Sequence, residues 1–162
     1  FNNTIRYNIT LDLRVKREHI EKVIEMAQFG KVIDRLEKGL NTNVLEKGVS
    51  LSGGEKQRLA LARGILAARK SEILLLDEPT SSVDSLNEMR IHDALFRVFR
   101  KKTIICSIHR LHLLDKFDYI YLFLEGRIIA EGNLSELKSN RVFSAMWRKY
   151  MRSSFAEKHN KE

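Results

Sequence analysis

The amino-acid sequence predicts an α/β fold: a mostly parallel β-sheet with flanking helices, preceded by a separate helical lobe. Two short apolar runs, 72–77 and 103–108, are typical of strands that are buried on both faces. Between them, the apolar residues of 86–99 recur at helical spacing, and the order strand, helix, strand is that of parallel strands joined by a crossover. The residues before Gly53 contain helical patterns with no strand between them, which predicts the lobe.

The other elements follow from periodicity and turn residues. Residues 1–8 show no pattern and are expected to be irregular. The glycines and asparagines of 39–48 indicate a loop, and Glu125-Gly126 is a hairpin turn signal. The predicted helices are 16–28, 31–37, 53–68, 134–138 and 142–151, and the predicted hairpin strands are 119–124 and 127–130.

The composition is that of a globular chain. Of the 162 residues, 43% are hydrophobic and 31% are charged, which excludes disorder as a class. No apolar run approaches the roughly 18 residues that a membrane-spanning helix needs. The net charge of +8 permits a nucleic acid or an anionic lipid as a neighbour, but we expect the basic residues near the C-terminal end to form a solvated helical face. The single cysteine, Cys106, lies in an apolar run and is expected to be a buried small side chain.

The segment from Leu51 to Gln57 stands directly before a predicted helix. Gly53 and Gly54 let a ligand approach the backbone without a Cβ in the way, and Ser52 is suited to cap the helix with its hydroxyl. The free N–H groups and the helix dipole would then attract an anion. The alternative is an ordinary capped helix after a glycine turn, and the segment taken alone favours this alternative.

Two adjacent acids, Asp77 and Glu78, end the first apolar run. They are expected at the C-terminal edge of the sheet, where open α/β sheets bind ligands. Asp77 is placed to hold Mg²⁺, directly or through water, and Glu78 could act as a base toward an attacking water. The alternative is a strand that ends in two solvated acids.

Two further features gain meaning from this context. The segment Ser81-Ser82-Val83-Asp84 is by itself a turn and a helix cap. His109 follows the second apolar run, and a lone histidine there is usually structural or exposed. Because both runs are expected to end at one sheet edge, His109 could lie next to Glu78 and donate a hydrogen bond to a terminal phosphate.

Together these motifs resemble the ABC ATPase family over the stretch from Phe1 to about Lys138. Four motifs in one order agree by chance far less often than any one of them. The resemblance implies part of a P-loop NTPase (ABC ATPase) fold. Residues 51–57 are similar to the family's signature motif, 73–78 to its Walker B strand with the catalytic glutamate, 81–84 to its D-loop and His109 to its switch histidine.

Two segments resemble exporter-type members of the family. Residues 1–9 are similar to the opening of their helical subdomain, and 42–48 to the loop before the signature that touches the coupling helices of the membrane part. The family usually has an acid where Asn43 stands. The implied division is a helical subdomain at 1–69, the C-terminal part of the RecA-like catalytic core at 70–139, and a C-terminal helix with a basic tail at 140–162.

One feature of the family is missing from the sequence. No Gly-x-x-x-x-Gly-Lys-Ser/Thr loop occurs: Gly48 and Gly53 have the glycine spacing, but Gly54 follows where lysine is needed. The glutamine of the family's Q-loop is also missing, and the chain opens on Phe1 without an initiator Met. We therefore expect the C-terminal part of such a domain, which hydrolyses ATP negligibly when it is alone.

The resemblance also implies roles for the site residues. Two such domains would meet head to tail and trap ATP, with Glu78 polarising the attacking water, His109 stabilising charge and Asp77 holding Mg²⁺ on the chain's own side. The implied partners are a second ATPase domain and the transmembrane domains of an exporter, with no nucleic acid, at the cytoplasmic face of a membrane. The implied nucleotide-binding residues are Leu51, Ser52, Gly53, Gly54, Glu55 and Gln57, which complete the opposite site, and Asp84, which reaches across the interface.

Other functions are compatible with parts of this pattern. A DNA-repair or chromosome-organising ATPase shares the signature and the Walker B strand, but Lys56-Gln57-Arg58 is transporter-like and no coiled-coil heptads precede Leu51. A translation-linked or regulatory ABC module would have no membrane partner, and the exporter-like loop at 42–48 argues against it. A naturally truncated interaction module is a third possibility.

Overall fold

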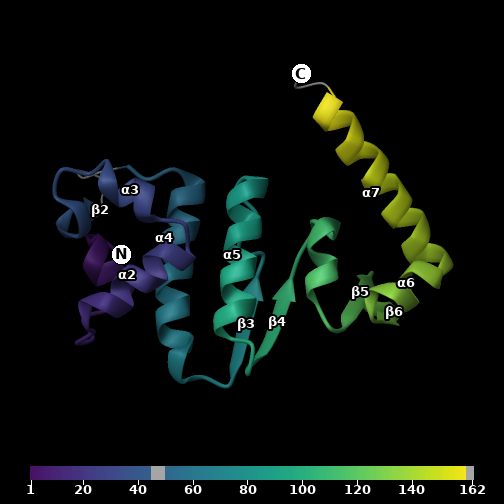
Figure 1. The fold of residues 1–162 in the computed structure, drawn as a ribbon, viewed down its shortest axis with the longest axis horizontal. Helices are drawn as coiled ribbons and strands as arrows, with labels where there is room; N and C mark the ends of the chain where they lie inside the picture. Colours follow the sequence, from purple (N-terminus) through teal and green to yellow (C-terminus); the bar gives the residue numbers. More distant parts are fainter. Residues whose placement is uncertain (45–49, 160–162) are drawn as a thin grey trace. The chain divides into compact units, whose positions relative to one another are not determined.

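The computed structural model describes residues 1–44 and 50–159, so part of the expected exporter-like loop at 42–48 lies outside the described residues. The chain divides into two compact units, Phe1–Ser107 and Ile108–Glu162. The first unit contains the helices of the predicted lobe and the parallel strands (Figure 1). Its elements are β1 (Asn3–Thr4), α1 (Ile5–Thr10), α2 (Arg17–Met26), α3 (Gly30–Asp34), η1 (Gly39–Asn41), β2 (Asn43–Val44), α4 (Gly53–Ala67), η2 (Ala68–Lys70), β3 (Ile73–Asp77), α5 (Ser85–Val98) and β4 (Thr103–Ser107).

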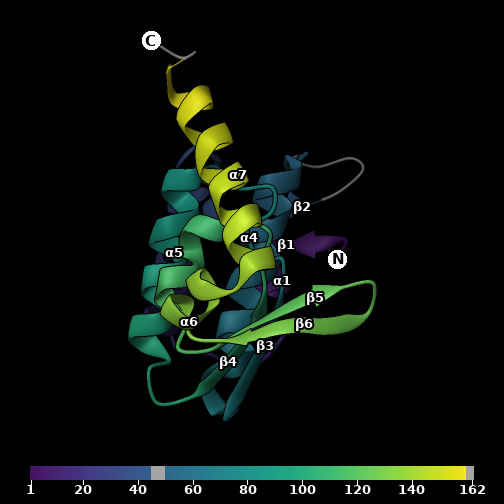
Figure 2. The same cartoon turned by 90° about the vertical axis from the view of Figure 1, so that its right-hand side faces the viewer.

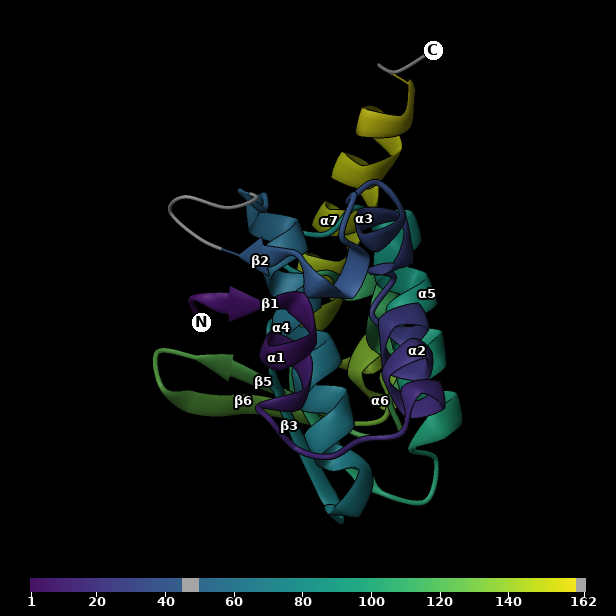
Figure 3. The same ribbon diagram turned by 90° about the vertical axis from the view of Figure 1, so that its left-hand side faces the viewer.

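The expectation of an irregular segment at 1–8 is wrong. Strand β1 pairs antiparallel with β2, and α1 follows at once (Figure 3). The Thr4 hydroxyl accepts a hydrogen bond from the Tyr7 N–H at 3.1 Å and caps α1, and Leu11 ends the helix in the left-handed region at φ 50°. A helix of 6 residues is too short to show a period, which is why the sequence pattern gave no signal.

The longer helices lie where the periodicity predicts them. The apolar residues that recur at helical spacing are buried in α2 and α4, whereas Leu86 and Met89 in the first half of α5 are exposed. The buried apolar residues of α5 are Ile91, Ala94 and Leu95, and the buried face of its first half is polar, with Glu88 at 2% exposure.

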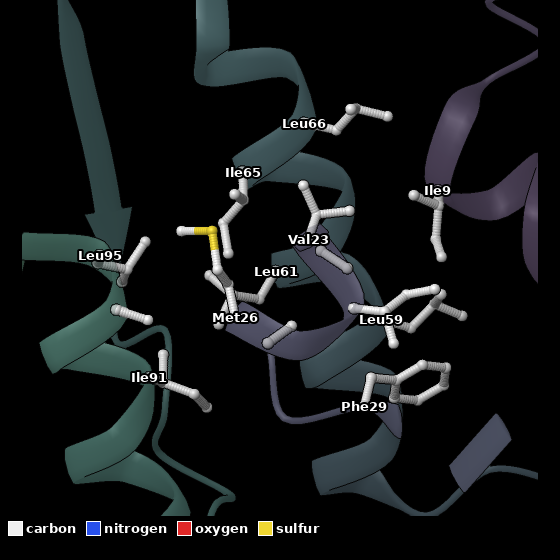
Figure 4. Packing of buried hydrophobic residues seen from close by; sticks show 14 of the residues in the cluster. Ile9, Val23, Met26, Phe29, Leu59, Leu61, Ile65, Leu66, Ile91 and Leu95 are labelled. Carbon is white, nitrogen blue, oxygen red and sulfur yellow. The ribbon is translucent and has the colours of Figure 1, made fainter. Parts of the chain in front are cut away.

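A single apolar cluster joins α1, α2, α4 and α5 with strand β3. Figure 4 shows side chains of three helices converging, among them Val23 and Met26 of α2, Ile65 of α4, and Ile91 and Leu95 of α5. Each such side chain contributes about 1.5–3 kcal/mol when it leaves water. This cluster therefore fixes the helices against the strand that carries the acid pair.

The domain division at residues 69 and 139 stays a prediction.

Strands β3 and β4 are parallel, in a register that places Ile73 opposite Thr103 and Asp77 opposite Ser107. The prediction that both runs are buried on both faces is wrong for the described chain: Leu75 is 75% exposed and Ile105 is 56% exposed. Within the first unit, the helices cover one face of this strand pair. Cys106 is half-buried rather than buried, and burial, with a smaller contribution from the Asp77 charge, raises the pKa of its thiol to about 12.

The second unit contains the predicted hairpin and the two C-terminal helices (Figure 2). The turn is confirmed at Glu125 and Gly126, both in the left-handed region at φ 49° and 75°. A capping box between Asn133 and Glu136 begins α6, and a small apolar core includes Leu137 and Phe143. The elements are η3 (Leu111–Lys116), β5 (Ile120–Leu124), β6 (Arg127–Gly132), α6 (Leu134–Ser139) and α7 (Arg141–His159).

A buried polar cluster holds the segment after β3 against α5. The Thr80 hydroxyl donates to Glu88 Oε1 at 2.8 Å and lies 3.3 Å from His92 Nε2. All three residues are at most 3% exposed. Buried polar groups need partners, because the desolvation of an unmatched one costs about 1–3 kcal/mol. The cluster therefore ties Thr80 to one position on α5.

We predict that Thr80→Val lowers the free energy of unfolding of the protein by about 1–3 kcal/mol, because valine keeps the shape of threonine but removes a donor from a buried carboxylate. Denaturant unfolding measures the change. Thr103→Val, at an exposed position of β4, is the matched control and should change stability by at most about 0.5 kcal/mol. Equal losses in the two variants would contradict the structural role of the Thr80 hydroxyl.

Candidate functional site

The acid pair lies at the C-terminal edge of the two parallel strands, as the sequence predicts. Asp77 is the last residue of β3 and faces Ser107, the last residue of β4. The Ser107 hydroxyl donates to Asp77 Oδ1 at 2.5 Å and accepts from the Glu78 N–H at 3.0 Å. The same N–H lies 3.3 Å from the Ser107 carbonyl oxygen. One serine thus orients both acidic residues.

The backbone of Glu78 is in the left-handed region, at φ 42°. For a residue with a Cβ this conformation costs roughly 1–2 kcal/mol, so neighbouring groups must hold it. Ser107 holds the N–H, and the side-chain amide of Gln57 donates to the Glu78 carbonyl oxygen at 2.8 Å. Strained backbone of this kind is concentrated at functional sites, which makes Glu78 the most distinctive residue of the edge.

The N-terminus of α4 is closed by a capping box. The Ser52 hydroxyl accepts from the Glu55 N–H at 3.3 Å, and Glu55 Oε2 accepts from the Ser52 N–H at 2.9 Å. Arg35 pairs with Glu55 Oε1 at 2.7 Å. Ser52 and Gly53 remain exposed, so the first turn and its dipole face outward. The Glu55 side chain, in contrast, is directed into the chain's own structure.

The pKa of Glu55 results from opposing effects. Burial by itself would raise it, but the hydrogen bond from the Ser52 N–H and the neighbouring Arg35 guanidinium outweigh burial, so the pKa lies below its ordinary value of 4.5. The charged form of Glu55 is therefore the form that the folded state stabilises.

The two glycines of the segment have different surroundings. A Cβ on Gly54 would lie 2.4 Å from the Ser82 carbonyl oxygen, whereas a Cβ on Gly53 would have no atom within 4 Å. Leu51 is 3% exposed and packs in the core, so only its backbone could reach a ligand. Gly54 is thus required by a close approach inside the chain, and Gly53 is the open position.

Gln57 connects α4 with the segment that follows β3. Besides its bond to the Glu78 carbonyl, its Nε2 donates to Ser81 Oγ at 2.9 Å, and its Oε1 accepts from the Ser82 N–H at 2.9 Å. The side chain uses both ends of its amide on this segment. The family resemblance implies that Gln57 is a nucleotide-binding residue, and that role stays a prediction.

Asp84 begins α5 as its N-cap. Its carboxylate accepts from the Asn87 N–H at 3.0 Å and from the Asn87 side-chain amide at 2.6 Å, while Val83 before it is buried. The bond from the Asn87 backbone, followed by that from its side chain, lowers the pKa of Asp84. The predicted contact of Asp84 across an interface is untested and stays a prediction.

His109 lies two residues beyond β4 and belongs to the second unit. Its side chain is exposed. The predicted approach of His109 to Glu78 therefore stays a prediction. The structure does bring together the glycine-rich helix start and the segment 78–84, which the sequence placed in separate motifs.

Sequence reasoning missed Ser107, Thr80 and Arg35. For Ser107 a signal existed, because it is the polar residue near the end of the second apolar run, and parallel strands that start together also end together. Thr80 and Arg35 had no local signal, since their partners Glu88 and Glu55 lie 8 and 20 residues away.

The Asp77 carboxylate, at the end of β3, is a suitable ligand for a divalent cation. Within the described ranges no group of three or more His, Cys, Asp or Glu side chains could hold a metal by itself. Asp77 is exposed and its Oδ1 is oriented by Ser107, which fits the way Mg²⁺ is held by one or two carboxylates together with nucleotide phosphates. The donor set thus suits a cation that arrives with phosphates.

None of the helices that the structure describes has both the length and the apolar character to span a bilayer. Parallel strands that end in an acid pair, beside an outward-facing glycine-rich helix start, define part of the nucleotide-binding domain of a P-loop NTPase. Comparison with known proteins agrees with this class and identifies the family within it.

The family model described as ABC transporter matches residues 2–81. An ATP-dependent lipid A-core flippase of Vibrio vulnificus is 40% identical over 139 residues, which are 85% of this chain and 24% of that protein. The protein of the same name from Photorhabdus laumondii is 40% identical over 151 residues, which are 91% of this chain and 26% of that protein. The structure of a bacterial Atm1-family ABC exporter with ATP bound has a TM-score of 0.80 at 34% identity, covering 92% of this chain and 26% of that one.

The chain belongs to the ABC transporter family, as part of an exporter-type ATP-binding domain. It spans about a quarter of the length of the curated relatives that it matches. The resemblance inferred from the four motifs, and the P-loop NTPase fold that it implies, are thereby confirmed.

Substitution of Gly53 and of Gly54 should have different effects on stability. Gly54→Ala should lower the free energy of unfolding by about 1–3 kcal/mol, because its Cβ would meet backbone that has to shift. Gly53→Ala has open space and should leave stability unchanged or slightly higher, because alanine favours helix. Thermal unfolding of both variants measures the difference, and a larger loss in Gly53→Ala would contradict the packing argument.

The capping box predicts a pH dependence. Since the pKa of Glu55 is lowered by folding, its contribution to stability is present above pH 4.5 and is lost as the pH falls through the folded-state pKa. Glu55→Gln should therefore destabilise the protein at pH 7, and the difference between the two proteins should shrink as the pH falls below 4.5. The measurement is the difference in unfolding temperature between the two proteins from pH 3 to 7. A pH-independent difference would contradict the role of the charge.

Proposed function

We propose that the chain is the C-terminal part of a domain that binds and hydrolyses ATP to power export across a membrane. The observation that carries the proposal is the acid pair at the end of β3, with Glu78 held in a left-handed conformation next to the start of α4. The kinship with lipid A-core flippases and with an Atm1-family exporter supports an exporter as the parent protein.

In this proposal the chain contributes to two ATP sites. Asp77, Glu78 and His109 act on the ATP of their own side, and Ser52, Gly53 and Gly54 meet the terminal phosphate of an ATP held by a second domain in head-to-tail arrangement. Asp84 reaches across the same interface. The outward-facing first turn of α4 supports the second role, because free N–H groups and the positive end of a helix dipole attract phosphate.

The chemistry is an in-line attack of water on the terminal phosphorus. The Glu78 carboxylate accepts the proton of the water, and the bond from phosphorus to the leaving oxygen of ADP breaks. His109 donates a hydrogen bond to the phosphate oxygens as charge develops. Mg²⁺, held at Asp77, would supply neutralisation of the phosphate charge. Loss of the terminal phosphate removes the ligand of Ser52 and lets the two domains separate.

Transmembrane domains and a second ATPase domain are the partners that this function requires, and the cytoplasmic face of a membrane is its location. An ATPase of DNA repair, of chromosome organisation or of translation would share the acid pair and the glycine-rich helix start. The relatives named as flippases and the exporter structure favour transport over these alternatives.

The test is Glu78→Gln in the full-length protein. We expect steady-state ATP hydrolysis to fall by a factor of about 10²–10⁴, because a positioned base contributes that much, while bound ATP and the closed dimer persist. Phosphate release and nucleotide retention are the measurements. Glu72→Gln is the matched control: Glu72 is an exposed glutamate that immediately precedes β3, and it should keep full activity. Unchanged turnover in Glu78→Gln would remove Glu78 from the catalytic role.

A further inference from the structure

The side chain of Gln57 is directed at its own chain's acidic edge. Its three hydrogen bonds, of 2.8, 2.9 and 2.9 Å, all go to residues 78–82. Both the donor and the acceptor end of the amide are engaged. A glutamine that contacted a nucleotide on another subunit would have to give up at least part of this set.

The segment is fixed from both sides. On the side of α4, the Ser82 carbonyl oxygen lies so close to Gly54 that no Cβ fits there. On the side of α5, Thr80 is bound to the buried Glu88. The distance between Gln57 and the segment is therefore set by packing, and the three hydrogen bonds need no rearrangement to form.

The direction of the Glu78 side chain depends on the two peptide units that flank its Cα. Ser107 holds the first of them through the Glu78 N–H, at 3.0 Å from the hydroxyl. Gln57 holds the second through the Glu78 carbonyl, at 2.8 Å. With both peptide planes fixed around a left-handed residue at φ 42°, the Cα–Cβ bond has one direction.

We propose that Gln57 is a positioning residue for Glu78, which acts by holding the peptide unit after it and not by contact with nucleotide. The inference rests on the proposed function, because it gives Gln57 a task in the hydrolysis that Glu78 performs. It also assigns a signature-helix side chain to the site on the chain's own side, while Ser52 and Gly53 of the same helix face outward.

The first experiment measures the kinetics of ATP hydrolysis by the full-length protein. Gln57→Ala should lower kcat about tenfold, as expected for the loss of one or two aligned hydrogen bonds, and leave KM for ATP within about twofold. Gln57→Glu keeps the acceptor for the Ser82 N–H but loses the donor, so its kcat should fall as much. Ser81→Ala removes one bond of the three and should lower kcat about two- to threefold. Gln28→Ala is the matched control, since the side chain of that half-buried glutamine donates to the Glu25 carbonyl within its own segment, and it should behave as the unmodified protein.

The second experiment separates positioning from nucleotide contact. In a Glu78→Gln background, adding Gln57→Ala should lower the residual hydrolysis no further, and ATP should be retained to the same extent, because Gln57 acts through Glu78. A raised KM with unchanged kcat, or a loss of retained ATP in the double variant, would overturn the inference and return Gln57 to the nucleotide. Absence of ATP hydrolysis in the unmodified protein would instead reject the proposed function itself.

Discussion

The hydrogen bonds that keep Glu78 in its left-handed conformation are the constraint on which the C-terminal edge of β3 and β4 depends. Strand β3 must stay in register with β4 up to Asp77, and the chain must then turn at once toward α5. For a residue with a Cβ, the left-handed conformation of that turn costs roughly 1–2 kcal/mol of free energy. Each good hydrogen bond contributes about 1 kcal/mol of stabilisation. The bonds from Ser107 and Gln57 to the two sides of Glu78 are thus of the size needed to offset the strain.

The glycine-rich segment before α4 therefore combines two kinds of residue. Gly54 and Gln57 serve the chain's own interior, since one accommodates the Ser82 carbonyl and the other bonds to residues 78–82. Glu55 is likewise occupied by the cap and by Arg35. Ser52 and Gly53 face outward and have room for a ligand. The segment predicted as one ligand site thus combines exposed residues with residues that have close contacts within the chain.

Most of the elements could be predicted because their signals are local. The apolar run at 72–77 and the period of α4 are visible in any window of the sequence. The left-handed turn at Glu78 could not be predicted, because glutamate does not favour it and the groups that hold it are 21 and 29 residues away. The exposure of Leu75 could not be predicted either, because an apolar strand indicates what its side chains favour and not what covers them in the described chain.

The linkage through Gln57 also limits how the parts can move. Its amide joins α4, near its N-terminus, to the segment 78–82, while Thr80 joins that segment to α5. A shift of the α4 start must either stretch these three bonds, which now have ordinary lengths of 2.8–2.9 Å, or carry residues 78–82 with it. A displacement of the start of α4 would therefore also act on the backbone of Glu78.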